Sequence, residues 1–173
     1  MTLPDSNPLE FKIYSEKYFT RTRLIADSEG NVLYAIKNES IASNKRLEDY
    51  ATGQTLWQVK GRWGFVNEVD FIAAKLHRKY KLGGDEFRFE YDAVPYKWVP
   101  KDLLSKYTYQ CFHRDTDEPV ADFNYKHCSR TFGTVTIYPK EGYSKGLIQL
   151  LIFTVFRIVQ VQRNEDRGAS GGG

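Results

Sequence analysis

The strongest constraint in this sequence is an apolar segment close to its C-terminal end. Within residues 147–161, only four polar residues interrupt the apolar side chains: Gln149, Thr154, Arg157 and Gln160. A run of this length exceeds the usual strand of about 4–8 residues. At about 100° per residue, three of the four polar residues fall on one narrow stripe of a helix, and most of its circumference is apolar. The segment is therefore predicted to be a helix that is surrounded on nearly every side.

Two environments could surround such a helix, namely a protein core or a lipid bilayer. A membrane-spanning helix needs about 20 apolar residues. This run is shorter and carries Arg157 near its end, so transmembrane insertion is not expected. The β-branched residues in the run, among them Ile148, Ile152 and Val155, leave one long strand or two strands as the alternative.

The rest of the chain is predicted to be mostly β-structure. Its 173 residues suit one domain, and a 15% aromatic content with 12 Tyr and 11 Phe favours pleated sheet. Short β-like runs alternate with turn signals, as in antiparallel sandwiches and barrels. Residues 22–26 and 32–36 form the clearest predicted hairpin, across a turn that contains Gly30. A second hairpin joins residues 46–51 to 56–60, with Gly53 supplying positive φ.

Charge and cysteine content indicate the broad class of the protein. The net charge of +3 is too small to predict a nucleic-acid partner. Residues 1–5 lack a secretory pattern, and two cysteines are too few for a disulfide framework. We therefore expect an intracellular, cytoplasmic protein with reduced thiols, and a secreted carbohydrate-binding β protein is the disfavoured alternative. Residues 1–8 and 164–173 are expected to be flexible ends of a domain that spans residues 9–163.

Several stretches of the sequence resemble the fungal tubby-like family of unknown function. The resemblance rests on the segment from Ala26 to Tyr34, on Pro95-Tyr96-Lys97-Trp98, on the segment from Pro119 to Phe123, and on the apolar terminal run. That family is similar in fold to LURP-one-related proteins, tubby C-terminal domains and phospholipid scramblases. The resemblance implies a closed antiparallel barrel of about 12 strands that encloses a C-terminal hydrophobic helix near residues 147–161. A barrel of this width needs side chains to fill its interior, and the apolar helix needs a surrounding sheet.

A basic row is the best local signal for a binding site. In a strand, alternation would place Lys75, His77, Lys79 and Lys81 on one face, with Leu76, Arg78 and Tyr80 on the other. Such a row could hold the phosphate of an anionic phospholipid. The alternative is a solvated outer face that discourages edge pairing between molecules.

Metal and catalytic sites are not predicted. Cys111, His113, His127 and Cys128 lack the usual zinc-ligand spacing. The acidic turn of Asp115, Asp117 and Glu118 lacks the pattern of an EF-hand loop. No nucleophile elbow, phosphate-binding loop or zincin helix occurs in the sequence. We therefore expect no cofactor, no metal and no enzymatic activity.

Our interpretation of the sequence is a non-enzymatic, intracellular tubby-like module. Its expected partner is a protein or an anionic phospholipid, bound in the cytoplasm or at the surface of a membrane. The alternative is a lipid-handling, scramblase-like protein or an uncharacterised enzyme that acts through the barrel and its helix. A barrel with a filled interior would favour the binding module, whereas a deep polar pocket would favour the enzyme or lipid-handling protein.

Overall fold

The computed structural model describes residues 7–18, 21–38, 45–127 and 130–171. It contains thirteen antiparallel strands and one helix, as the sequence predicts for fold class. The strands are β1 (Leu9–Tyr14), β2 (Arg23–Ala26), β3 (Val32–Asn38), β4 (Lys45–Asp49), β5 (Thr55–Lys60), β6 (Gly64–Asn67), β7 (Ala73–Lys75), β8 (His77–Lys79), β9 (Glu86–Tyr91), β10 (Val94–Pro100), β11 (Tyr109–His113), β12 (Pro119–Tyr125) and β13 (Thr131–Ile137). The helix is α1 (Lys145–Ser170).

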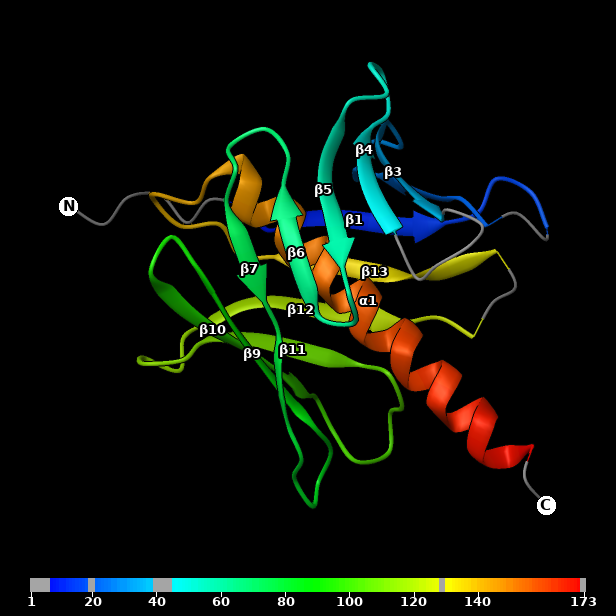
Figure 1. Cartoon of the computed structure of the whole chain (residues 1–173), viewed down its shortest axis with the longest axis vertical. Helices are drawn as coiled ribbons and strands as arrows, with labels where there is room; N and C mark the ends of the chain where they lie inside the picture. The colour runs from blue at the N-terminus through cyan, green and yellow to red at the C-terminus, as the bar shows by residue number, and fades with distance from the viewer. Residues whose placement is uncertain (1–6, 19–20, 39–44, 128–129, 172–173) are drawn as a thin grey trace.

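The strands form one sheet that curls into a nearly closed barrel around α1 (Figure 1). The strand order is β7-β6-β5-β4-β3-β2-β1-β13-β12-β11-β10-β9-β8, so nearly every connection is a hairpin and β1 joins the sheet beside β13. The two ends of this order, β7 and β8, are separated in sequence by Leu76 alone. The observed thirteen strands therefore agree with the expected twelve if residues 73–79 are counted as one interrupted strand.

The two hairpins predicted from turn chemistry are confirmed. Between β2 and β3, the Asp27 carboxylate accepts backbone N–H groups from Glu29 (3.0 Å) and Asn31 (2.9 Å), and Gly30 has φ +87°. Such side-chain to backbone bonds hold the chain in a tight turn. Between β4 and β5, Gly53 has φ +70°.

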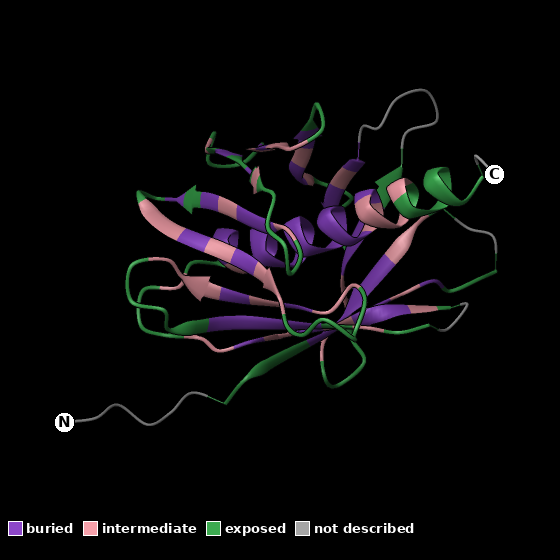
Figure 2. Ribbon diagram, turned by 90° about the horizontal axis from the view of Figure 1, so that it is seen from below, coloured by how far each residue is buried: buried purple, intermediate pink, exposed green. Residues whose placement is uncertain are grey.

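The apolar segment fills the barrel, as the sequence predicts. Leu150, Leu151, Ile152 and Val155 are completely buried although they point in different directions from the helix axis. Figure 2 shows the buried part of α1 between the sheet walls and its exposed C-terminal turns beyond them. By length and composition α1 could cross a membrane, but 78% of its most apolar 18-residue window is buried. The ring of apolar contacts supplies the surroundings that this helix requires.

The helix is longer than expected, and this corrects the predicted tail. It begins at Lys145, where the Ser144 hydroxyl caps it by accepting the Leu147 N–H (3.1 Å). It continues to Ser170, so residues 164–170, which we expected to be flexible, are helical. Contacts that the sequence does not reveal support these last turns, including an ion pair between Arg78 and Glu165 (2.9 Å).

Candidate functional site

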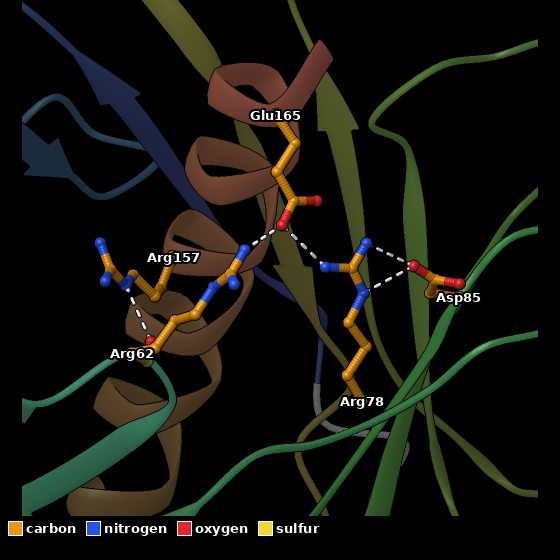
Figure 3. A network of polar contacts seen from close by, with 5 residues as sticks. All are labelled: Arg62, Arg78, Asp85, Arg157 and Glu165. Atoms are coloured by element: carbon orange, nitrogen blue, oxygen red, sulfur yellow. Dashed lines mark hydrogen bonds and ion pairs between the residues drawn. The ribbon is translucent and has the colours of Figure 1, made fainter. Parts of the chain in front are cut away.

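Two polar regions flank α1 where it leaves the barrel, and they differ sharply in charge. On one side lies a cluster of paired charges, drawn in Figure 3. Arg78 contacts Asp85 (2.6 Å) and Glu165 (2.9 Å), and Arg62 also pairs with Glu165. Arg157 donates from Nε to the Arg62 carbonyl (3.2 Å). These contacts tie the helix to the β5–β6 turn, to β8 and to the start of β9, so their role is structural.

The other side of α1 carries a group of cations that we call the cationic pocket. This hollow of about 250 Å³ is lined by the cations Arg21, Arg23, Lys45, Arg163 and Arg167, with Phe132 and Phe156 beside them. No described carboxylate lines the pocket. Within the residues that the structure describes, none of the five cations forms an ion pair. The cationic pocket is therefore our candidate functional site.

Strand alternation places two of these cations toward the helix. Arg23 shares a strand face with the buried Ile25 of β2, and Lys45 shares one with the buried Leu47 of β4. Side chains two residues apart point to the same face of a strand. Both cations are thus built into the inner wall of the barrel at its end, where core positions are otherwise apolar.

Lys45 is the most unusual member of the cationic pocket. It is 5% exposed, and its ammonium donates a hydrogen bond to Asn38 Oδ1 (3.0 Å). Burial, together with Arg157 and Arg23, lowers the pKa of Lys45 to about 8. A buried ammonium ordinarily has a carboxylate partner, because burying an unpaired charge costs free energy. Among the described residues Lys45 has no carboxylate partner, and an anion in the pocket would supply one.

The neighbouring arginines experience the same environment. Burial and Arg163 hold the pKa of Arg23 below its ordinary value, and burial and Arg62 do the same for the pKa of Arg157. Arg163 also lies over the rings of Tyr125 (5.2 Å) and Phe132 (6.0 Å), which fix its guanidinium at the rim of the pocket. Closely spaced cations repel one another, and groups with pKa values shifted in this way are candidates for a functional site.

The basic row predicted from sequence is only partly assembled. Lys75, His77 and Lys79 are exposed on the outer face of β7 and β8, as alternation predicts. Lys81 lies beyond the end of β8 and pairs with the buried Glu86. Tyr80, predicted on the inner face, is 76% exposed because the strand has already ended. The proposed role of these residues in binding stays a prediction.

The zinc and calcium alternatives gain no support from the described residues. No group of three or more His, Cys, Asp and Glu side chains with metal-binding geometry occurs among them, and Cys128 lies outside them. Cys111 is completely buried, and burial raises the pKa of its thiol. In the acidic turn, Asp117 pairs with Lys97 (2.5 Å) and Glu118 with Lys140 (2.6 Å).

Sequence reasoning missed the cationic pocket, although one signal for it exists. Gln160, Arg163, Asn164 and Arg167 follow the i, i+3, i+4, i+7 spacing of one helix face. This stripe is visible only if the helix continues past residue 161. The other cations of the pocket, Arg21, Arg23 and Lys45, lie more than 100 residues earlier in the chain, so no local pattern joins them to the stripe.

Comparison with known proteins shows the fold. No family model matches the sequence, and no curated protein matches it. The structure is similar to the crystal structure of an Arabidopsis thaliana protein, AT5G01750, with a TM-score of 0.62 and 15% sequence identity. The similarity covers 90% of this chain and 91% of that protein. The chain thus shares its barrel with that plant protein along nearly its whole length.

Proposed function

We propose that this domain is a non-catalytic module that binds an anionic group in the cationic pocket at the end of its barrel. The observation that carries the proposal is Lys45, a buried ammonium without a carboxylate among its described neighbours. Around it stand Arg23 and Arg163, which carry the same sign of charge. Charge-assisted hydrogen bonds from such groups to phosphate or carboxylate oxygens are about twice as strong as neutral ones.

The anion that we propose is the head group of a phospholipid. Two loops beside the exit of α1 expose large aliphatic side chains, namely Leu82 before β9 and Leu103 and Leu104 before β11. Leu82 and Leu103 line a hollow together with Gln162 of the helix, which places them at the same end of the barrel as Arg163. The leucines and the cationic pocket lie on opposite sides of α1 at the same end of the barrel. Aliphatic and cationic side chains exposed at one end of a domain suit the interface of an anionic membrane.

We also propose that the protein is intracellular and is related to tubby-like domains. The free, buried Cys111 is in keeping with a reducing compartment, and the shared barrel is in keeping with a tubby-like relationship. The alternative function, passage of a lipid through the barrel, would require α1 to leave an interior that it fills. The cationic pocket needs no such movement, and we therefore favour binding.

Vesicle sedimentation with paired variants tests the proposal. Wild-type protein should bind phosphatidylcholine vesicles only when they contain phosphatidylserine. The double variant Arg23→Gln/Arg163→Gln should lose about a hundredfold or more in affinity, because each of the two lost charge-assisted bonds costs about 1.5–3 kcal/mol. The double variant Lys12→Gln/Lys60→Gln is the control, since it removes the same charge from exposed positions on β1 and β5.

A second pair of measurements separates a lipid from a soluble anion. Leu103→Ser/Leu104→Ser should weaken vesicle binding while leaving the binding of pyrophosphate, measured by calorimetry, unchanged. Equal losses in the pocket variant and the charge-matched control would refute a specific site. If the leucine variant keeps full affinity for vesicles, the membrane part of the proposal is wrong, whatever the result with pyrophosphate.

A further inference from the structure

The barrel has one seam, and it lies within residues 73–79. The first part of this segment, β7, pairs only with β6, and the second part, β8, pairs only with β9. Figure 1 shows β7 beside β6, with β9 on the other side of the seam. No ladder joins β7 to β9, although both strands are described in full. The two strands lie close to each other without pairing, so the hydrogen-bonded ladder of the barrel is interrupted at this point.

Hydrogen-bond alternation shows that backbone groups point into the opening. Leu76 N–H bonds to the Trp63 carbonyl (2.8 Å) and Asn67 N–H to the Ile72 carbonyl (2.7 Å). In an antiparallel pair, bonded and non-bonded residue pairs alternate. The backbone N–H and C=O groups of Ala73 and Lys75 consequently point away from β6, toward the seam.

The opposite edge of the seam presents Glu90 in the same way. A two-residue turn, Asp92-Ala93 with φ +50° and +60°, joins β9 to β10, so Tyr91 and Val94 form the bonded pair next to it. Glu90 therefore sits in a non-bonded pair, opposite Pro95, and its backbone groups face the seam. Continuing the β8–β9 register would set Glu90 opposite Lys75, but no bond between them occurs.

Side chains give this opening a defined character. A hollow of about 310 Å³ lies here, and we call it the seam slot. The lining includes Ala74, Lys75, His77, Arg88, Glu90 and Arg114. Ala74 is buried and small, so the floor is apolar and leaves room for a neighbour. Arg88 pairs with Glu86, and Arg114 lies 3.7 Å from Glu90. Lys75 forms no ion pair with any described residue, so the slot keeps one positive charge in excess.

We propose that the seam slot accepts an extended, acidic segment of a partner protein, which adds to the sheet as a further strand. Its backbone would bond to the free N–H and C=O groups of Lys75 or Glu90, and this mode of recognition draws affinity from the main chain. Its alternate side chains would be small over Ala74 and acidic toward Lys75 and Arg114. This site is separate from the cationic pocket and does not depend on the proposed function.

Fluorescence anisotropy tests the proposal with a labelled peptide of alternating Val and Glu. The peptide should bind the full-length protein, and the same peptide with N-methylated backbone amides should bind at least about tenfold more weakly, because it keeps its charge but loses donors to the sheet. A Val and Lys peptide should not bind. Equal binding of the methylated peptide would overturn strand addition and leave only charge attraction.

Protein variants locate the site independently. Lys75→Glu/Arg114→Glu should abolish binding of the Val and Glu peptide, whereas Lys12→Glu/Lys60→Glu should not change it by more than about twofold at physiological salt. Both are outward-facing changes, and circular dichroism verifies that each variant is folded. Equal losses of peptide affinity in the two double variants would overturn the site. The proposal would also be overturned if Lys75→Glu/Arg114→Glu left peptide binding intact but reduced the binding of vesicles or pyrophosphate. Lys45→Met should leave peptide affinity unchanged. Failure of the strand-addition proposal can therefore be distinguished from failure of the anion-binding proposal for the cationic pocket.

Discussion

At the scale of single residues, a buried hydrogen bond links the helix to the barrel wall. The indole Nε1–H of Trp98 donates to Thr154 Oγ1 (3.1 Å), and the Thr154 hydroxyl donates to the Leu151 carbonyl (3.1 Å). Both Trp98 and Thr154 are completely buried. The one polar side chain in the middle of the apolar helix is therefore a partner for the indole, which would otherwise be left without an acceptor.

Replacing Thr154 with Val should show how much the hydrogen bond from Trp98 contributes to the free energy of unfolding. Val keeps the shape of Thr but leaves the Trp98 N–H unpaired, and an unsatisfied buried donor costs about 1–3 kcal/mol. We expect the free energy of unfolding in urea to fall by that amount. Thr154→Ser keeps the hydroxyl and should cost less. A valine variant as stable as wild type would show that the indole does not depend on this acceptor.

Lys45 should reduce stability at neutral pH, and Lys45→Met should raise it. The folded-state pKa of about 8 lies below the ordinary value of 10.5. Below pH 8 both states hold the proton, so the folded protein bears the whole cost of the buried charge. Between pH 8 and 10.5 the folded state loses its proton first, unfolding takes one up, and wild-type stability rises with pH.

The measurement compares urea unfolding of Lys45→Met and wild type at pH 7 and pH 10. The stability gain of the variant should be largest at pH 7 and should shrink toward pH 10, when the wild-type lysine is neutral in the folded state. Lys60→Met, at an exposed position, should show little gain at either pH. A Lys45→Met variant that is less stable than wild type at pH 7 would contradict the claim that the buried ammonium of Lys45 destabilises the fold.

At the scale of elements, α1 acts as the filling of the barrel. Truncation after Gly146 removes side chains that account for much of the buried core, among them Leu150, Phe153 and Ile158. The remaining sheet cannot close over such a void. We expect insoluble or molten protein, with weak near-ultraviolet circular dichroism and strong binding of a hydrophobic dye. A truncated protein that is soluble and unfolds cooperatively would contradict this role.

The helix also shows how far the sequence alone could lead. The buried part of α1 was predictable because a helix that is apolar around its whole circumference must be surrounded by other parts of the protein. Its last turns were not, because Glu165 and Asp166 look like a solvated tail until Arg78 and Tyr107 are placed beside them. Alternation likewise predicted Lys75, His77 and Lys79 on one face, but could not reveal that β8 ends at Lys79.

At the scale of the whole molecule, the barrel brings distant segments to one end. Arg23, Lys45 and Arg163 come from β2, β4 and α1 and meet only because the sheet wraps around the helix. No sequence pattern spans such separations, and this is why the fold was predictable while the cationic pocket was not. The seam slot was equally hidden, since it depends on where a ladder stops and not on residue type.

Ligand linkage in the whole domain tests the central claim, that the cationic pocket is an anion site. Thermal unfolding of wild type with pyrophosphate at a hundredfold excess over Kd should raise Tm by about 5–10 °C, since such binding adds about 2.7 kcal/mol. Lys45→Met should start from a higher Tm and gain little from pyrophosphate. The same gain in both proteins, or none in wild type, would contradict the claim.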